Sequence, residues 1–385
     1  SDTKISAGSS ITATSFYGSG ANLSSLPSQS PVVTGIASGT IPANRSLAIL
    51  SDGKVGVITG TKAEWGPYAK IGTTDIVANT GDLVCGNGKV VALARRSSDS
   101  TGHCAVGTIS GTTITWGAWT EFAASNCDGY IRGVYDPNSD KFVVFWRNSS
   151  NVAGKVISVS GTTPSFGSIA QVSAGALEGL ELCMDPDTNQ IVLHMKNSSN
   201  VANVYMVAIS GTTLTWGTGL QVAPSNSYAP GVTYDTKNNK VILALGYDGG
   251  SGHGNKCWAY IGTVSGTDIT IVSAGEVYYN TNQNRLNMIY DEERERIVLT
   301  AYNYNTNELQ SYVGKYVSAT SITWGKRSVI RSADASNLHT SGSNCLAYDP
   351  YNKSYVLLSQ KSSSITQLYY YRGKINPADS SDPEV

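Results

Sequence analysis

Carboxylates and histidines are the residues of this sequence that could catalyse a hydrolysis or an elimination. Glycoside hydrolysis needs two carboxyl groups that flank the scissile bond, and a histidine can also transfer a proton. Glu178 and Glu181 lie three residues apart in one polar segment, and His253 and His339 lie in two others. If the protein is a polysaccharide hydrolase or lyase, these four residues are the candidates for its catalytic groups.

No catalytic motif accompanies these residues. The sequence contains no nucleophile elbow, no HExxH helix and no Gly-rich phosphate loop. It also lacks the S-x-D-x-G-x-x-W boxes that are usual in sialidases, and no convergent arginine triad can be read from it. We therefore predict no catalytic residues and a non-enzymatic function.

Two Asp-rich turns and the cysteines are the groups that could bind a metal. The segments DPNSD at 136–140 and DPDTN at 185–189 place oxygen ligands at alternate positions, as calcium loops do, but no bidentate Glu follows either one. The cysteines show no CxxC spacing, so they indicate neither a zinc site nor a disulfide framework. We predict no metal, no cofactor and thiols that are free and mostly buried.

The elements that position all of these residues come from a repeat of about fifty residues. Its most specific phrase is SGTTITWG at 110–117. Further copies lie at 7–14, 59–66, 160–167, 210–217, 265–272 and 318–325. The Gly supplies the positive φ of a hairpin turn, and the alternating Thr residues after it favour an extended strand. Ala319 replaces this Gly in one copy, so we expect that turn to be strained or of another type.

A second phrase joins two apolar strands through an Asp turn, as in YDPNSDKFVVFW at 135–146. Asp and Asn bond their own backbone in such turns, and Pro presets φ. The strand after the turn is a nearly continuous apolar run, which is expected where both faces of a sheet are covered. Each repeat therefore contains four strands. We name them A, which ends at Tyr-Asp, B after the Asp turn, C before Ser-Gly-Thr, and D with Trp-Gly.

Four-stranded units at this period predict an all-β fold, a seven-bladed β-propeller with antiparallel blades. We expect one domain over residues 1–385, with 376–385 as a C-terminal tail. The last repeat, 344–375, lacks strand D, and the N-terminal copy of the phrase has no strands A to C before it. We therefore expect strand 5–16 to pair beside 367–375, so that it completes the seventh blade and closes the ring.

The two ends of such a propeller differ. The Asp turns and the Ser-Gly-Thr turns are uniform and lie on one face, whereas the B–C and D–A connections on the other face vary in length and content. Binding specificity normally resides in such variable loops. Their Asn, Ser and Tyr side chains suit hydroxyl-rich ligands. The candidate ligand contacts are Tyr130, Arg132, Tyr228, Tyr247, Tyr279, Arg285, Tyr302 and Tyr304.

Charge and hydropathy argue against two kinds of partner. The 27 Lys and Arg residues balance 28 Asp and Glu residues, for a net charge of −1. Such a surface has no counterion-release drive toward nucleic acid. No apolar run approaches the roughly 20 residues that span a bilayer, so we expect no membrane insertion.

The Tyr-Asp-Pro turns, the short Val-rich strands after them and the Ser-Gly-Thr-Thr phrases together resemble the tandem repeats of phage tail-fibre and other virion-surface proteins. Some secreted bacterial adhesion proteins carry similar repeats. The resemblance covers about residues 5–375. It implies a recognition or adhesion module, located on a virion surface or outside the cell, that binds a host glycan or receptor or other tail proteins. A hydrolase or lyase and a structural hub of the tail assembly stay open as alternatives.

Overall fold

The protein is described by a computed structural model. Its described residues are 47–49, 55–57, 71, 76–111, 113–127, 129–173, 175, 177–223, 227–247, 256–278, 283–303, 306, 308–331, 345–349, 354–360 and 368–375. The chain divides into two compact units, 1–67 and 68–385. In the first unit, β1 (Leu47–Ile49) and β2 (Val55–Val57) form an antiparallel two-stranded sheet.

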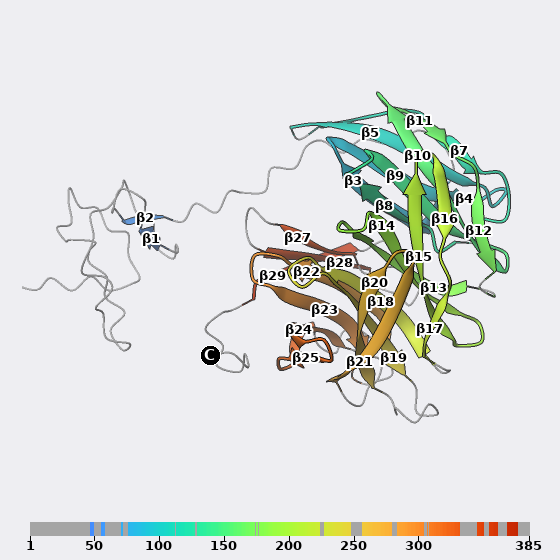
Figure 1. Cartoon of the computed structure of the whole chain (residues 1–385). Helices are drawn as coiled ribbons and strands as arrows, with labels where there is room; N and C mark the ends of the chain where they lie inside the picture. Colours follow the sequence, from blue (N-terminus) through green and yellow to red (C-terminus); the bar gives the residue numbers. More distant parts are fainter. Residues whose placement is uncertain are drawn as a thin grey trace, which may run out of the picture. The chain divides into compact units, whose positions relative to one another are not determined.

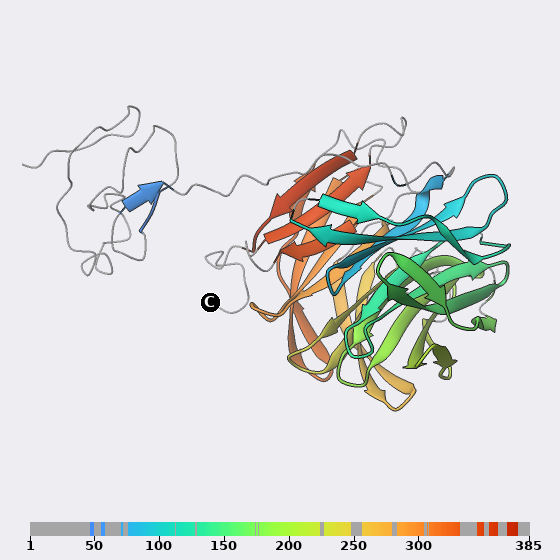
Figure 2. The same ribbon diagram turned by 90° about the horizontal axis from the view of Figure 1, so that it is seen from above.

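The second unit is an all-β propeller, with its sheets arranged around a common axis (Figure 1, Figure 2). We number the sheets in chain order as blades 1 to 6. Blade 1 contains β3 (Ile76–Gly86), β4 (Lys89–Arg96), β5 (Gly102–Ser110), β6 (Thr113–Trp116) and β7 (Thr120–Ala123). Blade 2 contains β8 (Arg132–Asp136), β9 (Lys141–Asn148), β10 (Asn151–Ser160), β11 (Thr163–Phe166) and β12 (Ala170–Ser173). Blade 3 contains β13 (Leu177–Asp185), β14 (Gln190–Asn197), β15 (Ala202–Ser210), β16 (Thr213–Trp216) and β17 (Leu220–Ala223).

The remaining blades follow the same order. Blade 4 contains β18 (Ser227–Asp235), β19 (Lys240–Tyr247), β20 (Cys257–Ser265) and β21 (Asp268–Tyr278). Blade 5 contains β22 (Gln283–Asp291), β23 (Arg296–Asn303), β24 (Glu308–Ser318), β25 (Ser321–Trp324) and β26 (Ser328–Arg331). Blade 6 contains β27 (Cys345–Asp349), β28 (Ser354–Gln360) and β29 (Leu368–Gly373). Neighbouring strands within every blade are antiparallel, which confirms the predicted fold class.

The apolar cores lie between blades rather than inside them. The A strands contact one another in succession from β3 to β27, so they are the innermost strands. In β9, all five residues from Phe142 to Trp146 are buried, because neighbouring blades cover both faces of a B strand. Each apolar cluster draws on two successive blades, and the one shared by blades 5 and 6 is the smallest, with Tyr302, Leu309 and Leu357 as its buried members.

The outer strand of a blade is split where its sequence contains Trp-Gly or Phe-Gly. In blade 2, β11 and β12 pair with successive parts of β10, and Gly167 between them donates its N–H to the Val156 carbonyl. A Cβ on Gly167 would lie 1.8 Å from the carbonyl oxygen of Thr212, in the Ser-Gly-Thr turn of blade 3. Gly117 and Gly217 meet Thr162 and Thr267 of their next blades in the same way. The glycine therefore makes room for the turn of the following blade.

Blade 4 departs from this rule, and blade 5 departs from the repeat at its Ser-Gly-Thr turn instead. The phrase of blade 4 ends in Ile271 and Val272 instead of Trp-Gly, and β21 is one continuous strand. In blade 5 the turn glycine is replaced by Ala319, whose backbone is not in the left-handed region that Gly111, Gly161, Gly211 and Gly266 adopt. The turn at Ala319 is therefore of another type, which is one of the two outcomes that the sequence left open.

A buried aspartate organises each A–B turn of blades 2 to 5. Asp136, Asp185, Asp235 and Asp291 are fully buried. In blade 3, the Asp185 carboxylate accepts the backbone N–H groups of Asp187 and Thr188 and the Thr188 hydroxyl. Because a buried carboxylate is costly without donors, these bonds fix the conformation of the turn.

A tyrosine of the next blade donates a hydrogen bond to the A–B turn of blade 3 and to that of blade 5. Tyr234 of blade 4 donates its hydroxyl to Asp187 of blade 3 at 2.6 Å. Burial, with help from the neighbouring Asp235 carboxylate of blade 4, raises the pKa of Tyr290 of blade 5. Tyr234 of the Tyr-Asp phrase is therefore bound to the A–B turn of the preceding blade.

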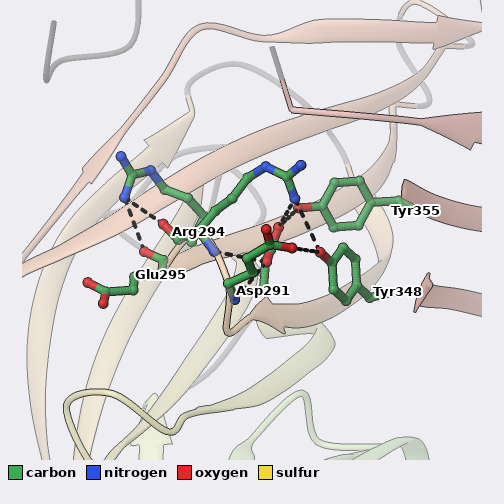
Figure 3. A network of polar contacts seen from close by, with 7 residues as sticks. Asp291, Arg294, Glu295, Tyr348 and Tyr355 are labelled. Atoms are coloured by element: carbon green, nitrogen blue, oxygen red, sulfur yellow. Dashed lines mark hydrogen bonds and ion pairs between the residues drawn. The ribbon is translucent and has the colours of Figure 1, made fainter. Parts of the chain in front are cut away.

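The junction between blades 5 and 6 has the densest polar network (Figure 3). The Asp291 carboxylate accepts hydrogen bonds from Tyr355 and Arg294, and Arg294 also donates to Tyr348. Burial opposes ionisation of Asp291, but these donors outweigh it and hold the pKa of the carboxyl below its ordinary value. Because blade 6 shares only a small apolar cluster with blade 5, this network is a main part of its attachment.

Blade 1 shows why its turn can lack the aspartate. Gly86 stands at the equivalent place, and a Cβ there would lie 2.2 Å from the Tyr135 ring, so the ring occupies that space. The Tyr135 hydroxyl donates to Asp140 of its own blade instead. The turn itself is an Asn87-Gly88 hairpin with positive φ at both residues.

Polar contacts also join the tips of successive A–B turns. Asn87 donates to Asp140, Asn138 donates to Asn189, and Lys237 pairs with Glu295, each across one junction. These contacts therefore join the A–B turns of blades 1, 2 and 3 in succession and the turn of blade 4 to that of blade 5.

The expected count of seven blades is wrong for the described part of the chain, which forms six. The count relied on the phrase at 59–66, but the described strands before that phrase are β1 and β2, each only three residues long and in the other compact unit. No strand closes the edge of β29 among the described residues, and the expected closing strand 5–16 lies outside them. Leu83 is 65% exposed, so one face of β3 is also uncovered by the described residues.

The split outer strand predicts that Gly167→Ala is destabilising. The added Cβ collides with the backbone of Thr212, which cannot rotate away, so we expect a loss of about 1–3 kcal/mol in the free energy of unfolding. Urea denaturation followed by tryptophan fluorescence measures it. Gly325→Ala is the matched control, because its Cβ would meet the nearest atom at an ordinary 3.5 Å. Equal losses in the two variants would contradict the explanation.

The network of Figure 3 predicts that Tyr355→Phe costs stability. The variant removes a donor from Asp291, which is fully buried, and we expect a loss of about 1–3 kcal/mol. Thermal unfolding by circular dichroism measures the change. In the control, Tyr348→Phe, the affected groups remain in contact with water, so the loss should be smaller. A Tyr355 variant as stable as the parent would disprove the assignment.

Candidate functional site

Three charged residues occupy equivalent positions on the inner strands of three successive blades. Asp82, Arg132 and Glu181 each lie four residues before the turn position of Gly86, Asp136 or Asp185. They therefore lie at one level along β3, β8 and β13, toward the end that carries the B–C and D–A connections. The repeat itself brings them together around the axis.

Arg132 connects blade 2 to blade 3. Its Nε and Nη2 donate to Glu181 Oε1 at 3.3 and 2.9 Å, and its Nη1 donates to the Ile131 carbonyl at 3.0 Å. The side chain of Arg132 is 15% exposed and that of Glu181 is 29% exposed. The pair is thus partly desolvated, which strengthens its attraction relative to a pair on an open surface.

Asp82 connects blade 1 to blade 2. Its Oδ2 accepts the backbone N–H of Gly133 at 2.9 Å, and its Oδ1 accepts the N–H of Leu83. Burial raises the pKa of this carboxyl, although the Arg132 charge and the two N–H groups act in the opposite direction. Burial therefore favours the protonated form of the Asp82 carboxyl.

A second ion pair lies at the start of β13. Lys196 Nζ lies 2.6 Å from Glu178 Oε2. The ammonium side chain is only 7% exposed, whereas the carboxylate side chain is 42% exposed. Glu178 therefore presents its oxygen atoms to solvent while it neutralises a buried cation.

Tyr130 precedes this charged row in a loop with an unusual backbone. Its φ is +49°, which is costly for a bulky residue, and Gly129 before it has a φ of +110°. The Gly129 carbonyl accepts the N–H of Arg147, and the Tyr130 ring packs partly against the core between blades 2 and 3. The loop is thereby fixed, and Tyr130 is held next to Arg132. We call Asp82, Tyr130, Arg132, Glu178, Glu181 and Lys196 the axial cluster.

The other expected contacts do not join this cluster. Tyr247 and Tyr302 are 2% and 5% exposed and belong to the core, so their rings offer no face to a ligand. Tyr228 lies on β18 and Arg285 on β22, but their side chains are outside the described part. The expected residues Tyr279, Tyr304, His253 and His339 lie outside it altogether.

Sequence reasoning missed Asp82 and Lys196. Both sit inside strands, where they were not compared with the loops. The signal that finds Asp82 is its register, four residues before Gly86, because the same offset leads to Arg132 from Asp136. The expected hydrolytic carboxylates Glu178 and Glu181 are both engaged by cations of the cluster.

The arrangement supplies hydrogen-bond acceptors and donors, a tyrosine ring and a carboxyl with a raised pKa. Within the described residues, no group of three or more His, Cys, Asp or Glu side chains could hold a metal ion. Cys85, Cys104, Cys127, Cys183 and Cys257 are free thiols. The described part also contains no helix with the length and hydropathy needed to cross a membrane.

Comparisons with known proteins agree with the fold. No protein-family model matches the chain, and no curated protein matches its sequence. A solved protein from Lactobacillus plantarum aligns with 76% of this chain and 84% of its own, at 12% identity and a TM-score of 0.51. The Pseudomonas aeruginosa periplasmic gluconolactonase PpgL aligns with 76% of this chain and 88% of its own, at 7% identity and a TM-score of 0.50. The Aleuria aurantia lectin, solved with a fucosylated disaccharide, aligns with 80% of this chain and 100% of its own, at 12% identity and a TM-score of 0.47. At these identities the likeness concerns the fold alone.

One histidine beside the cluster predicts a pH dependence of stability. His194 pairs across β13 and β14 with Glu181, is fully buried, and bonds the Gly231 carbonyl of blade 4 through Nδ1 at 3.0 Å. Burial lowers its pKa from 6.5 to about 4, although the bond to Gly231 acts in the opposite direction. Between these two values the unfolded chain binds the proton more tightly. The free energy of unfolding should therefore fall on acidification from pH 6.5 to 4, by at most about 1.4 kcal/mol per pH unit.

Denaturant titrations at several pH values measure this slope in the parent and in His194→Gln. The other titrating groups are common to both proteins, so the difference between the two curves isolates His194. A parent and variant with parallel curves between pH 6.5 and 4 would contradict the assignment.

Proposed function

We propose that this β-propeller is a non-enzymatic recognition module that binds a host glycan or receptor with the end formed by its B–C and D–A connections. The setting that we propose is a phage tail or a similar surface appendage, located on a virion or outside the cell. The resemblance of the repeat to tail-fibre proteins supports this setting. Other tail proteins are further partners in the same proposal.

The observation that carries the proposal is the contrast between the two ends of the propeller. At the A–B turns, the buried aspartates and the residues at the turn tips bond to other groups of the protein. At the opposite end, the axial cluster breaks the repeat, since Asp, Arg and Glu occupy one position in three successive blades. The A–B turns repeat from blade to blade, whereas the residues at the opposite end differ between blades. Specific recognition is therefore expected at the opposite end.

The chemistry of the axial cluster suits sugar hydroxyls. Glu178 and Glu181 present partly exposed carboxylates, which accept hydrogen bonds from hydroxyls. Tyr130 supplies an aromatic side chain whose position is fixed by its loop. Pre-organised aromatic and polar groups reduce the entropy that binding costs.

A second function, as a polysaccharide hydrolase, is favoured by one specific observation. Burial raises the pKa of the half-buried Asp82 carboxyl, and Glu181 is ion-paired with Arg132 of the neighbouring blade. A carboxyl with a raised pKa and a second, ion-paired carboxylate are candidates for the acid and the base of such a reaction. Asp82 would then replace His253 and His339 as the partner of Glu181.

A glycan array tests the recognition proposal, with purified full chain as the probe. We expect binding to a defined set of glycans, weakened about tenfold or more by Tyr130→Gly, which removes the ring but tolerates the positive φ. Lys237→Ala is the control and should bind like the parent. Lys237 lies in the A–B turn of blade 4, at the end of the propeller opposite to the proposed site, and its side chain is 61% exposed.

The same glycans are then incubated with the protein and assayed for new reducing ends or unsaturated products. Release of such products, abolished by Asp82→Asn, would replace the binding-only function with the hydrolase. A parent protein that binds no glycan and no host cells would refute recognition of either kind.

A further inference from the structure

The axial cluster also indicates the chemical class of the ligand. Resting on the proposed function, we infer that the site selects an uncharged, hydroxyl-rich glycan and discriminates against glycans that carry carboxylate, sulfate or phosphate groups. Glu178 and Glu181 are the residues that set this preference, as acceptors of ligand hydroxyls.

The guanidinium of Arg132 is already committed. Two of its nitrogen atoms donate to one oxygen of Glu181, and the third donates to the chain itself at Ile131. An acidic sugar would have to displace a partly buried carboxylate that is held in place by the fold. Exchanging one carboxylate for another gains little energy and leaves Glu181 unpaired.

The ammonium of Lys196 is committed as well. It is 7% exposed and lies 2.6 Å from Glu178, which covers it from the solvent side with a side chain that is 42% exposed. An approaching anion meets the carboxylate before it meets the cation. The electrostatic field at this place therefore repels anions and attracts hydroxyl donors.

The net charge of the axial cluster is not positive, as an anion-binding site would require. Asp82, Glu178 and Glu181 are three carboxylates against the two cations Arg132 and Lys196, which leaves one negative charge when all are ionised. If Asp82 takes up a proton, the balance becomes neutral. In neither state is the cluster positive, so a charged sugar gains no net attraction to offset its desolvation.

Two arginines lie on B strands, at the position that Lys196 occupies in blade 3, and they provide the competing interpretation. Arg95 on β4 donates to the Ser100 hydroxyl, and Arg147 on β9 donates to the Ser149 carbonyl at 3.4 Å. If these two arginines also contacted the ligand, acidic glycans would be preferred. The sign of the preference therefore reports whether Arg95 and Arg147 belong to the site.

The test is a glycan array in which each neutral oligosaccharide is printed beside its sialylated or sulfated counterpart. We expect the full chain to bind the neutral member at least tenfold more tightly, with an affinity that is unchanged between 50 and 500 mM salt, values on the order of those that screen surface charge. Binding to the acidic member that weakens with salt would overturn the inference while leaving recognition intact. Failure to bind either member would remove the proposed function and the inference together.

Isosteric variants locate the preference. Glu178→Gln and Glu181→Gln remove one carboxylate charge each, from beside Lys196 and Arg132 respectively, and should shift the ratio of neutral to acidic binding by about tenfold toward the acidic member. Glu295→Gln at the opposite end should leave the ratio unchanged. Melting curves establish that all three variants are folded. Unchanged ratios in both cluster variants would show that other residues set the preference, and would overturn the assignment.

Discussion

Blades 2 to 5 of this propeller depend on how the protein satisfies one buried carboxylate in each of their A–B turns. An aspartate with no exposure to water has to receive donors from every side, and the turn supplies backbone N–H groups and one side chain. The following blade supplies a tyrosine to the same turn in the later junctions. Because this donor belongs to the neighbour, these two turns are complete only when the next blade is in place. Local folding and ring assembly are thereby coupled at the junction of blades 3 and 4 and at that of blades 5 and 6.

Polar groups at the two ends of the propeller therefore have different roles. Polar groups at the A–B turns are used for assembly, which explains why the sequence varies so little there. The opposite ends of the same strands are under no such requirement. Three successive inner strands can therefore carry Asp82, Arg132 and Glu181 at one position, and these residues connect blades 1 to 3.

The sequence was sufficient for everything that repeats. The strands, the turns and the antiparallel blades follow from glycine at positive φ, from aspartate in its turns and from apolar B strands. The number of blades did not follow, because the count relied on the phrase at 59–66, which lies outside the described residues; the described strands before it are the short pair β1 and β2. The site was predicted only in part, through Tyr130, Arg132, Glu178 and Glu181. Tyr247 and Tyr302 differ from surface tyrosines only by their place at the end of a buried B strand, and Asp82 and Lys196 find partners in residues far along the chain.

The glycine that separates the halves of an outer strand has a consequence for how such a protein evolves. Gly167 is required by a turn in the next blade, so the sequence of one blade is matched to its successor. Blade 4 lacks the glycine, and the turn of blade 5 beside it is the one that contains Ala319. The two departures from the repeat therefore fall at one junction. The unit that has to be kept together when such a repeat is duplicated or exchanged is accordingly the junction, from the outer strand of one blade to the turn of the next, and not the single blade.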